Sequence, residues 1–276
     1  MEPPCVSVRI KGGLGNQMFQ IATAYAYAKR TGGRLQLLQN KCEYDGRTMY
    51  WDSTLYRWVP YITNSLPQSM VSWKEIGPTL YTPIPELPSA GMLLEGYFQS
   101  SHYFGSSETL SEIRKYMKPS PDQMDYIQTK YAELLKQRER VVVVHARRTD
   151  YLCKYNINFH GPLTIDYYQR AMERMSTYVE SPIFLLCSDD NRFWTLNMTV
   201  FPLLHTNKYH ILSEENDVNT LALLQQFPNL IIANSTFSWW AAWLAEAHHV
   251  IAPVRWFGPA GPQQNEDIYE YSWERM

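Results

Sequence analysis

The sequence of 276 residues has few cysteines, little net charge and no long run of apolar residues. Its four cysteines, Cys5, Cys42, Cys153 and Cys187, form no Cys-x-x-Cys pair and have no zinc-type spacing with a histidine. We therefore expect free, buried thiols in a reducing compartment and no bound metal. The net charge of −2 at pH 7 gives no sign of the basic stripe that nucleic-acid-binding proteins carry, so no nucleic-acid partner is expected.

No apolar stretch reaches the length of a membrane span, and the run 141–144 is only long enough for a core strand. Residues 1–4 contain neither the basic nor the apolar region of a signal peptide. We therefore expect a cytoplasmic protein without a membrane span. Hydrophobic residues make up 45% of the chain, which is enough to fill the core of one large α/β domain or of two modest ones.

The hydrophobic pattern alternates between strands and helices. Residues 6–10 read as a strand, Gly12–Gly15 as a turn and Asn16–Lys29 as a helix. Beyond residue 140 we expect strands at 141–146, 183–187, 230–233 and 250–252, and helices at 164–178, 191–197, 219–227 and 237–247. This repeated alternation predicts an α/β fold with doubly wound parallel sheets. We place the boundary between two domains after residue 130.

The first motif with chemical meaning is the glycine turn Gly12-Gly13-Leu14-Gly15, which is followed by Asn16. Small residues let a ligand approach the backbone, and the N-terminus of the following helix favours an anion. Met18 stands where a dinucleotide fingerprint needs its third glycine, which argues against a Rossmann oxidoreductase. A turn with a purely structural role is the alternative.

The second motif, His145-Ala-Arg-Arg-Thr-Asp150, ends a buried strand. Ligands of open α/β sheets bind at the carboxyl ends of strands, and an arginine fork there suits a diphosphate. Strand alternation predicts His145 and Arg147 on one side, with Arg148 and Asp150 on the other. The alternative for Arg148 is a local ion pair with Asp150 that closes the turn.

The third motif, Ser188-Asp189-Asp190, also follows a strand. A carboxylate such as Asp190 can accept two hydrogen bonds from guanine, but it can equally cap a helix or bind a metal. Metal-dependent glycosyltransferases use an Asp-x-Asp pattern. The stretch Glu215-Asn216-Asp217 imitates that pattern only loosely, and we interpret it as a solvated loop.

The fourth motif joins a strand to an apolar helix at Asn234-Ser-Thr-Phe-Ser-Trp-Trp240. Its hydroxyl groups and the free N–H groups of the helix N-terminus suit phosphate oxygens. The alternative is an ordinary Ser/Thr cap with Trp239 and Trp240 in the core.

Together these motifs resemble glycosyltransferase family 11, the α-1,2-fucosyltransferases. The matching stretches are Gly12–Gln20, Leu94–Ser100, His145–Asp150, Ser188–Asp190 and Asn234–Ala242. The resemblance implies a GT-B-like fold with two Rossmann-like halves facing a cleft. It implies that residues 131–276 bind GDP-fucose and that residues 1–130 act mainly on the acceptor side. It also implies inversion at the anomeric carbon without a metal or other cofactor.

The resemblance suggests a role for each motif. Arg147, supported by Asn16, would stabilise the GDP leaving group, and Asp150 or His160 would take the proton of the acceptor hydroxyl. The residues expected to bind the donor are Gly13, Gly15, His145, Arg147, Arg148, Asp190, Asn234, Ser235, Thr236, Phe237 and Ser238. The expected acceptor is a galactose-terminated oligosaccharide.

Two departures affect the linkage and the acceptor more than the donor. Thr149 stands where the family usually has glycine, and in this respect the motif resembles that of the α-1,6-fucosyltransferases. Thr220 stands where an aspartate is usual. Another fucose linkage, another GDP-sugar and a non-catalytic glycan-binding protein therefore stay open as alternatives.

Overall fold

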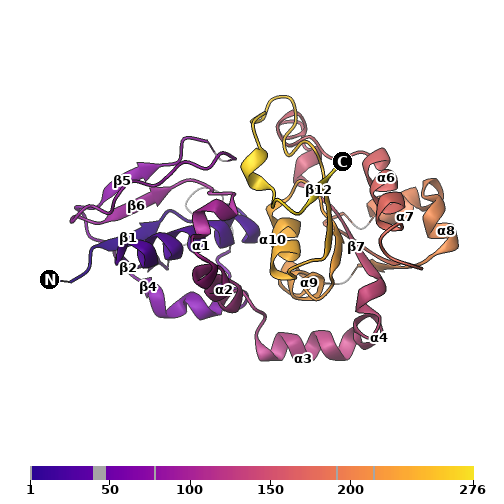
Figure 1. Ribbon diagram of the computed structural model, residues 1–276, viewed down its shortest axis with the longest axis horizontal. Coiled ribbons are helices and arrows are strands. Elements are labelled where there is room, and N and C mark those ends of the chain that lie inside the picture. The colour runs from indigo at the N-terminus through magenta and orange to yellow at the C-terminus, as the bar shows by residue number, and fades with distance from the viewer. Residues whose placement is uncertain (1, 40–47, 78, 191, 214) are drawn as a thin grey trace. The chain divides into compact units, whose positions relative to one another are not determined.

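The computed structural model describes residues 2–39, 48–77, 79–190, 192–213 and 215–276 (Figure 1). Cys42, and Asn191 at the start of one expected helix, lie outside the described residues. The chain forms two compact units: unit 1 is Met1–Lys118 with Gln264–Glu270, and unit 2 is Pro119–Gln263 with Tyr271–Met276. The first crossing, after Lys118, comes earlier than the boundary expected after residue 130.

The earlier crossing has a local cause at the start of helix α3 (Pro121–Lys130). Ser120 accepts the backbone N–H of Gln123 at 3.2 Å, and the Gln123 side chain accepts the backbone N–H of Ser120 at 2.8 Å. This capping box begins a helix that packs on helix α9 of unit 2. The return of residues 264–270 has no such local signal; it rests on long-range bonds such as Thr79 Oγ1 to the Gln264 carbonyl, at 2.6 Å.

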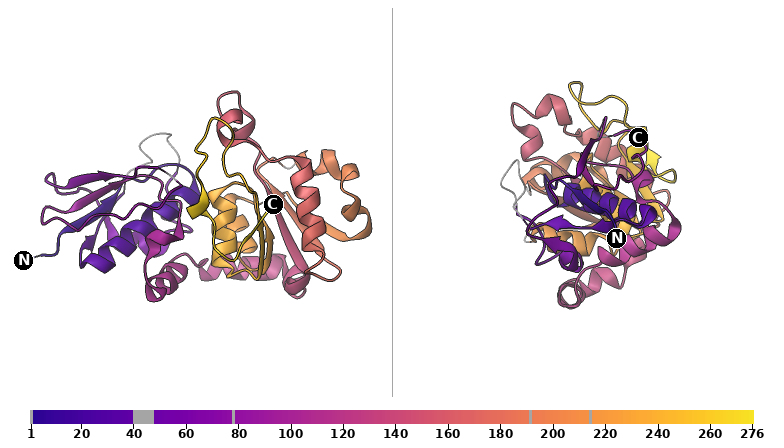
Figure 2. Two further views of the ribbon diagram at one scale, coloured as in Figure 1. Left: turned by 45° about the horizontal axis from the view of Figure 1, so that its top comes forward. Right: turned by 90° about the vertical axis from the view of Figure 1, so that its left-hand side faces the viewer.

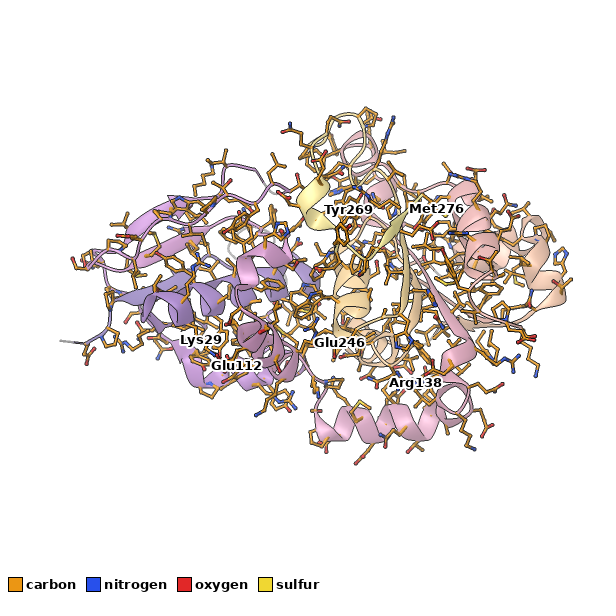
Figure 3. The ribbon with its side chains drawn as sticks, in the orientation of Figure 1. Lys29, Glu112, Arg138, Glu246, Tyr269 and Met276 are labelled. Atoms are coloured by element: carbon orange, nitrogen blue, oxygen red, sulfur yellow. The ribbon has the colours of Figure 1, made fainter. Side chains whose placement is uncertain are left out.

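Unit 1 is an α/β unit whose main sheet is parallel, with strand order β2-β1-β6-β5. Helix α1 packs along β1 and β2, and its residue Lys29 points to Glu112 of α2 (Figure 3). Its elements are β1 (Cys5–Val8), α1 (Leu14–Thr31), β2 (Arg34–Leu35), β3 (Leu37–Leu38), η1 (Tyr56–Tyr61), β4 (Ile62–Thr63), β5 (Val71–Lys74), β6 (Met92–Glu95), η2 (Ser101–Phe104), α2 (Ser107–Tyr116) and η6 (Glu266–Ile268).

Unit 2 has a larger parallel sheet with strand order β12-β11-β10-β7-β8-β9. Its elements are α3, α4 (Ala132–Leu135), η3 (Arg138–Arg140), β7 (Val141–Ala146), η4 (Asp150–Leu152), α5 (Ile157–His160), α6 (Ile165–Met175), β8 (Ile183–Ser188), α7 (Arg192–Asn197), η5 (Met198–Val200), α8 (Pro202–Thr206), β9 (Lys208–Leu212), α9 (Asp217–Leu224), β10 (Asn229–Ile231), α10 (Thr236–Leu244), β11 (His249–Ala252) and β12 (Glu274–Arg275).

Helices cover both faces of the larger sheet (Figure 2). Val142 and Val144 of β7 point into a hydrophobic cluster with α6 and with Trp194 of α7. His145, the next residue along β7, points to the opposite face of the sheet. Its ring lies 5.5 Å from that of Phe237 in α10. The predicted doubly wound parallel sheet is therefore present. None of the described helices combines the length and the apolar character needed to cross a membrane.

The strand order places a topological switch point in the main sheet of each unit. In unit 2 the chain runs from β7 outward to β8 and β9, and then returns to the other side of β7 with β10. In unit 1, β2 and β6 likewise lie on opposite sides of β1. Loops diverge at such points, and ligands of open α/β sheets bind there. The arginine motif follows β7 and the Asn234 motif follows β10, so both line the switch point of unit 2.

Candidate functional site

The centre of the site in unit 2 is a paired Arg147 just beyond β7. Its Nε donates to Asp150 Oδ1 and its Nη2 donates to Asp150 Oδ2, both at 2.9 Å. A second carboxylate, Asp189 Oδ2 at the end of β8, lies 3.3 Å from Nε. Burial lowers the pKa of Arg147, but the bonds to Asp150 and the charge of Asp189 outweigh it, so the net pKa is raised. The guanidinium is thus charged and held in one orientation.

The outer edge of this guanidinium is open. Among the residues that the structure describes, no hydrogen bond engages Nη1 of Arg147. The side chain is 25% exposed, so a ligand can reach it. An arginine whose inner edge is fixed by carboxylates and whose outer edge has free N–H groups is suited to bind an anion without further rearrangement.

Asp189 shapes the loop that carries the arginines. It accepts the backbone N–H of Arg148 at 2.7 Å and that of Thr149 at 3.1 Å, and it also accepts the Thr149 hydroxyl. Thr149 has right-handed backbone angles, φ −47° and ψ −73°, so a glycine is not needed at this position. Asp189 belongs to the Ser188-Asp189-Asp190 motif, but the sequence alone assigned it no role. The one sequence feature that could have pointed to a role for Asp189 is its position next to Asp190, directly after a strand.

The alternative in which Arg148 pairs with Asp150 is wrong. Nη1 of Arg148 donates to the Leu163 carbonyl at 3.0 Å, and its guanidinium lies 4.5 Å from the centre of the Phe193 ring. Alternation correctly separated Arg147 from Arg148, but it does not extend to Asp150. The strand ends at Ala146 and the chain turns into η4, which returns Asp150 to the side of Arg147.

His145 is almost fully buried, and its expected contact with the donor stays a prediction. It is 3% exposed, and burial lowers its pKa to about 4 although the charge of Asp189 opposes the shift. Its Nδ1 has no hydrogen-bond partner among the described residues. The ring packs beside that of Phe237 in α10, next to the switch point of unit 2.

The Asn234 motif divides into a buried clamp and an accessible helix start. Asn234 Nδ2 donates to the carbonyls of His160 at 2.7 Å and Trp256 at 3.0 Å, so this amide ties three loops together. Ser238 is fully buried, and its hydroxyl donates to the Ser235 carbonyl at 3.3 Å. The partly exposed residues are Thr236 and Phe237, in the first turn of α10. The backbone N–H groups there, more than the serine hydroxyls, are placed to bind an anion.

Asp190 acts as a turn cap in this structure. Its Oδ1 accepts the backbone N–H of Arg192 at 3.2 Å and the Arg192 Nε at 3.3 Å. No described residue donates to Oδ2, and the side chain is 26% exposed. The cap leaves Oδ2 free, but a two-bond contact with guanine would also need Oδ1, which the cap already uses.

The two candidate bases differ in how they are held. Asp150 is engaged on both oxygens by Arg147, so taking a proton would disrupt that ion pair. The His160 ring stacks on Tyr151 with centroids 4.2 Å apart, and burial lowers its pKa. A neutral imidazole can accept a proton, although a lowered pKa makes it a weaker base, so the identity of the base stays a prediction.

Unit 1 carries its own polar group at its switch point. Gly12 has φ +81°, and a Cβ atom there would lie 2.6 Å from Asn16 Nδ2, so this position requires glycine. Gly13 precedes helix α1, while Gly15 is buried within it. Asn16 Oδ1 accepts a hydrogen bond of 2.9 Å from Gln99 in the loop after β6. The sequence motif contained Gln99, but its pairing with Asn16 was not foreseen.

The stretch Glu215-Asn216-Asp217, interpreted as a solvated loop, is solvated only in part: Asn216 and Asp217 are exposed, but the Glu215 side chain is not. The Glu215 side chain is 2% exposed, and it accepts hydrogen bonds from Lys130 at 2.6 Å and Tyr131 at 2.6 Å. Asn216 caps helix α9 by accepting the backbone N–H of Asn219 at 2.8 Å. Over the described part of the chain, no three acidic, histidine or cysteine side chains gather in a metal-binding arrangement. Metal independence itself stays a prediction.

The fold of this chain is similar to the folds of several solved structures. The fucosyltransferase NodZ from Bradyrhizobium has a TM-score of 0.55 at 16% identity, over 96% of this chain and 97% of that one. POFUT1 in complex with GDP-fucose has a TM-score of 0.53 at 12% identity, over 99% of this chain and 97% of that one. At such identities the likeness shows the fold alone, and it confirms the predicted GT-B-like α/β class.

Sequence relatives cover almost the whole chain. It is 24% identical to the O-antigen biosynthesis glycosyltransferase WbnK of Escherichia coli, over 90% of this chain and 93% of that protein. It is 26% identical to an alpha-1,2-colitosyltransferase of Escherichia coli, over 91% of this chain and 92% of that protein. Residues 75–276, which include all of the site in unit 2, match the family described as glycosyl transferase family 11. The chain therefore belongs to glycosyl transferase family 11.

Proposed function

We propose that this glycosyltransferase moves L-fucose from GDP-β-L-fucose to the 2-hydroxyl of a β-galactoside, with inversion at the anomeric carbon and without a metal ion. The observation that carries the proposal is the open outer edge of Arg147 at the switch point of unit 2. A diphosphate is the anion that fits a fixed arginine fork beside a helix N-terminus. NodZ and POFUT1, whose folds this chain shares, have been solved with GDP-fucose, which is consistent with this donor.

The bond changes follow from that arrangement. The acceptor oxygen attacks C1 of fucose from the face opposite the diphosphate, and the bond between C1 and the β-phosphate oxygen breaks. Negative charge grows on the departing GDP, where Arg147 and the first turn of α10 stabilise it. The proton of the acceptor hydroxyl goes to His160 or to a phosphate oxygen. Asp190 Oδ2 is available to accept one N–H group of guanine, and Oδ1 would have to be shared with Arg192 to accept the second.

The donor is assigned to unit 2 and the acceptor mainly to unit 1. The elements that we expect to bind the diphosphate lie after β7, β8 and β10 of unit 2. The polar group at the switch point of unit 1, Asn16 with Gln99, carries amides rather than arginines. Amides both donate and accept, as sugar hydroxyls do. The alpha-1,2 linkage named for one relative agrees with the proposed linkage.

The test is transfer by the purified chain from GDP-fucose to lactose, followed as GDP release, with the product linkage determined by NMR. We expect acceptor-dependent GDP release, a fucose on the 2-hydroxyl of galactose, and unchanged rates in EDTA. Loss of all activity in EDTA with recovery in manganese would reject the metal-free mechanism. A product linked elsewhere would reject the proposed acceptor position and leave the donor intact.

A second candidate is the same reaction with another GDP-sugar, because one relative is named as a colitosyltransferase. The discriminating experiment offers GDP-fucose and other GDP-hexoses separately at equal concentration. GDP-fucose should give the highest kcat/KM. A higher value with another GDP-sugar would transfer the proposal to that donor.

A further inference from the structure

A buried carboxylate lies under the turn that precedes Gln99 in unit 1. Glu75, the residue after β5, is only 9% exposed. Its Oε2 accepts the backbone N–H of Tyr97 at 2.7 Å, and its Oε1 accepts that of Phe98 at 3.0 Å. Both carboxylate oxygens therefore hold consecutive backbone N–H groups of one turn. Burying a carboxylate costs free energy, so its presence here suggests a role beyond packing.

The turn that Glu75 holds is strained. Phe98 has φ +54°, a left-handed conformation that residues with side chains rarely adopt. Phe98 is fully buried between Trp73, with centroids 6.2 Å apart, and Tyr103, at 5.3 Å. A Cβ atom on Gly96 would lie 2.6 Å from Glu75 Oε2, so the carboxylate and the turn fit closely. Glu75 thus supplies charged hydrogen bonds that keep this conformation.

The turn delivers Gln99 to Asn16. Gln99 is 7% exposed, and its Nε2 donates to Asn16 Oδ1 at 2.9 Å. Because Oδ1 of Asn16 is occupied in this way, its Nδ2 is the group turned toward Gly12 and the loop after β1. This bond links the loops after β1 and β6, the two strands that flank the switch point of unit 1.

We propose that Glu75 is a positioning residue: by holding the turn 96–99 it makes Gln99 orient the Asn16 amide, so that Nδ2 donates to an oxygen atom of a substrate. This inference rests on the proposed function. The oxygen belongs either to a phosphate of the donor or to a hydroxyl of the acceptor sugar. Both accept the same hydrogen bond, and separate titrations of the two substrates distinguish them.

Protonation of Glu75 offers a readout that a purely structural role would not share. Burial raises the pKa of this carboxyl to about 7, while the N–H groups of Phe98 and Tyr97 and the charge of Lys11 act in the opposite direction. Lys11 faces it from the loop after β1, and Tyr103 faces it from η2. A protonated carboxyl would direct an O–H at a backbone N–H and release one end of the turn. Turnover should therefore rise with pH through about 7.

The experiment compares wild type with Glu75→Gln and Gln99→Leu, using GDP-fucose and lactose. Glu108→Gln is the matched control, because this carboxylate is 75% exposed and pairs only with Lys29 among the described residues. We expect each test variant to lower kcat about tenfold, equivalent to one lost substrate hydrogen bond. In Glu75→Gln the rise in rate near pH 7 should disappear. The double variant should be no slower than the slower single variant.

Two further measurements identify which substrate carries the oxygen atom that Asn16 contacts, and Gln99→Leu keeps the proposal testable if one variant fails to fold. A larger change in the Kd of GDP, measured by calorimetry, points to the phosphate, whereas a larger change in the KM of lactose points to the sugar. If Glu75→Gln does not fold, Gln99→Leu carries the test, and a wild-type kcat there overturns the proposal. A folded Glu75→Gln with wild-type kcat and pH profile also overturns it. A wild type that does not use GDP-fucose would instead reject the proposed function.

Discussion

Asp150 binds the guanidinium of Arg147 side-on, with Nε to Oδ1 and Nη2 to Oδ2 both at 2.9 Å. This pair is local in sequence, yet it determines which edge of Arg147 is left to a ligand. An arginine that must search for its anion loses side-chain entropy on binding, and one already held by a carboxylate loses less. The pair therefore preorganises the site for the diphosphate that we propose.

Arg147→Lys should lower turnover by about 10²-fold or more while changing GDP affinity less. Lysine cannot bond both oxygens of Asp150 and also present an outer edge to the leaving group. Steady-state kinetics and calorimetry with GDP check this. Arg174→Lys, which alters an exposed pair with Glu274 of the same unit, is the control and should behave as wild type. Equal losses of kcat and of GDP affinity would show ground-state binding instead.

Arg148→Lys should act mainly on stability. The guanidinium bonds to the Leu163 carbonyl and lies over the Phe193 ring, and a lysine loses the planar stacking. We expect a loss of about 1 kcal/mol in the free energy of unfolding, measured with urea, and a turnover within a few-fold of wild type. An inactive variant with normal stability would mean that Arg148, rather than Arg147, meets the diphosphate.

Asp189→Asn should weaken both the loop and the reaction. A carboxamide can replace one of the two acceptor oxygens that bind the N–H groups of Arg148 and Thr149, and its NH₂ group would face a donor. We expect a loss of about 1–3 kcal/mol in unfolding free energy and a lower kcat, because Arg147 is less firmly held. Asp166→Asn, at an exposed pair with Arg170, controls for the substitution itself. Unchanged stability would contradict the role given to Asp189.

Asp190→Asn separates capping from base recognition. The amide oxygen can still accept the backbone N–H of Arg192, so the turn should persist. Its NH₂ group cannot accept from guanine, and a lost charge-assisted contact is worth about 1.5–3 kcal/mol. Calorimetry with GDP and ADP should show weaker GDP binding and a smaller preference for GDP. An unchanged preference would leave Asp190 with a capping role only.

The burial of His145 predicts a pH dependence of stability. Burial lowers its pKa in the folded state to about 4, below the ordinary value of 6.5, so the unfolded chain binds a proton first as the pH falls. This contribution to stability is complete above pH 6.5 and is lost as the pH falls toward 4, by roughly 3 kcal/mol at most. His145→Phe should flatten the urea midpoint between these pH values. An unchanged slope would assign the dependence to another group.

Only part of the polar group in unit 1 could be predicted from the sequence. The glycine turn and Asn16 stood out, because a positive φ and a helix start leave a local signature. Glu75 lies far from them in sequence and carries no motif. Its meaning depends on β5 pairing with β6, which brings its carboxylate under the turn at Tyr97 and Phe98.

The sequence by itself determined what is periodic or local in this protein. Alternating strands and helices predicted doubly wound parallel sheets, and the polar motifs were correctly located at the ends of β7, β8 and β10. Only the tertiary structure decided which hydrogen-bond partner each polar side chain has. Asp150 pairs with Arg147 because alternation ends where the strand ends, and Nδ2 of Asn234 donates to carbonyls of distant loops. Periodicity records which face of an element is buried, whereas the partner of a side chain depends on which loops the sheet order brings together.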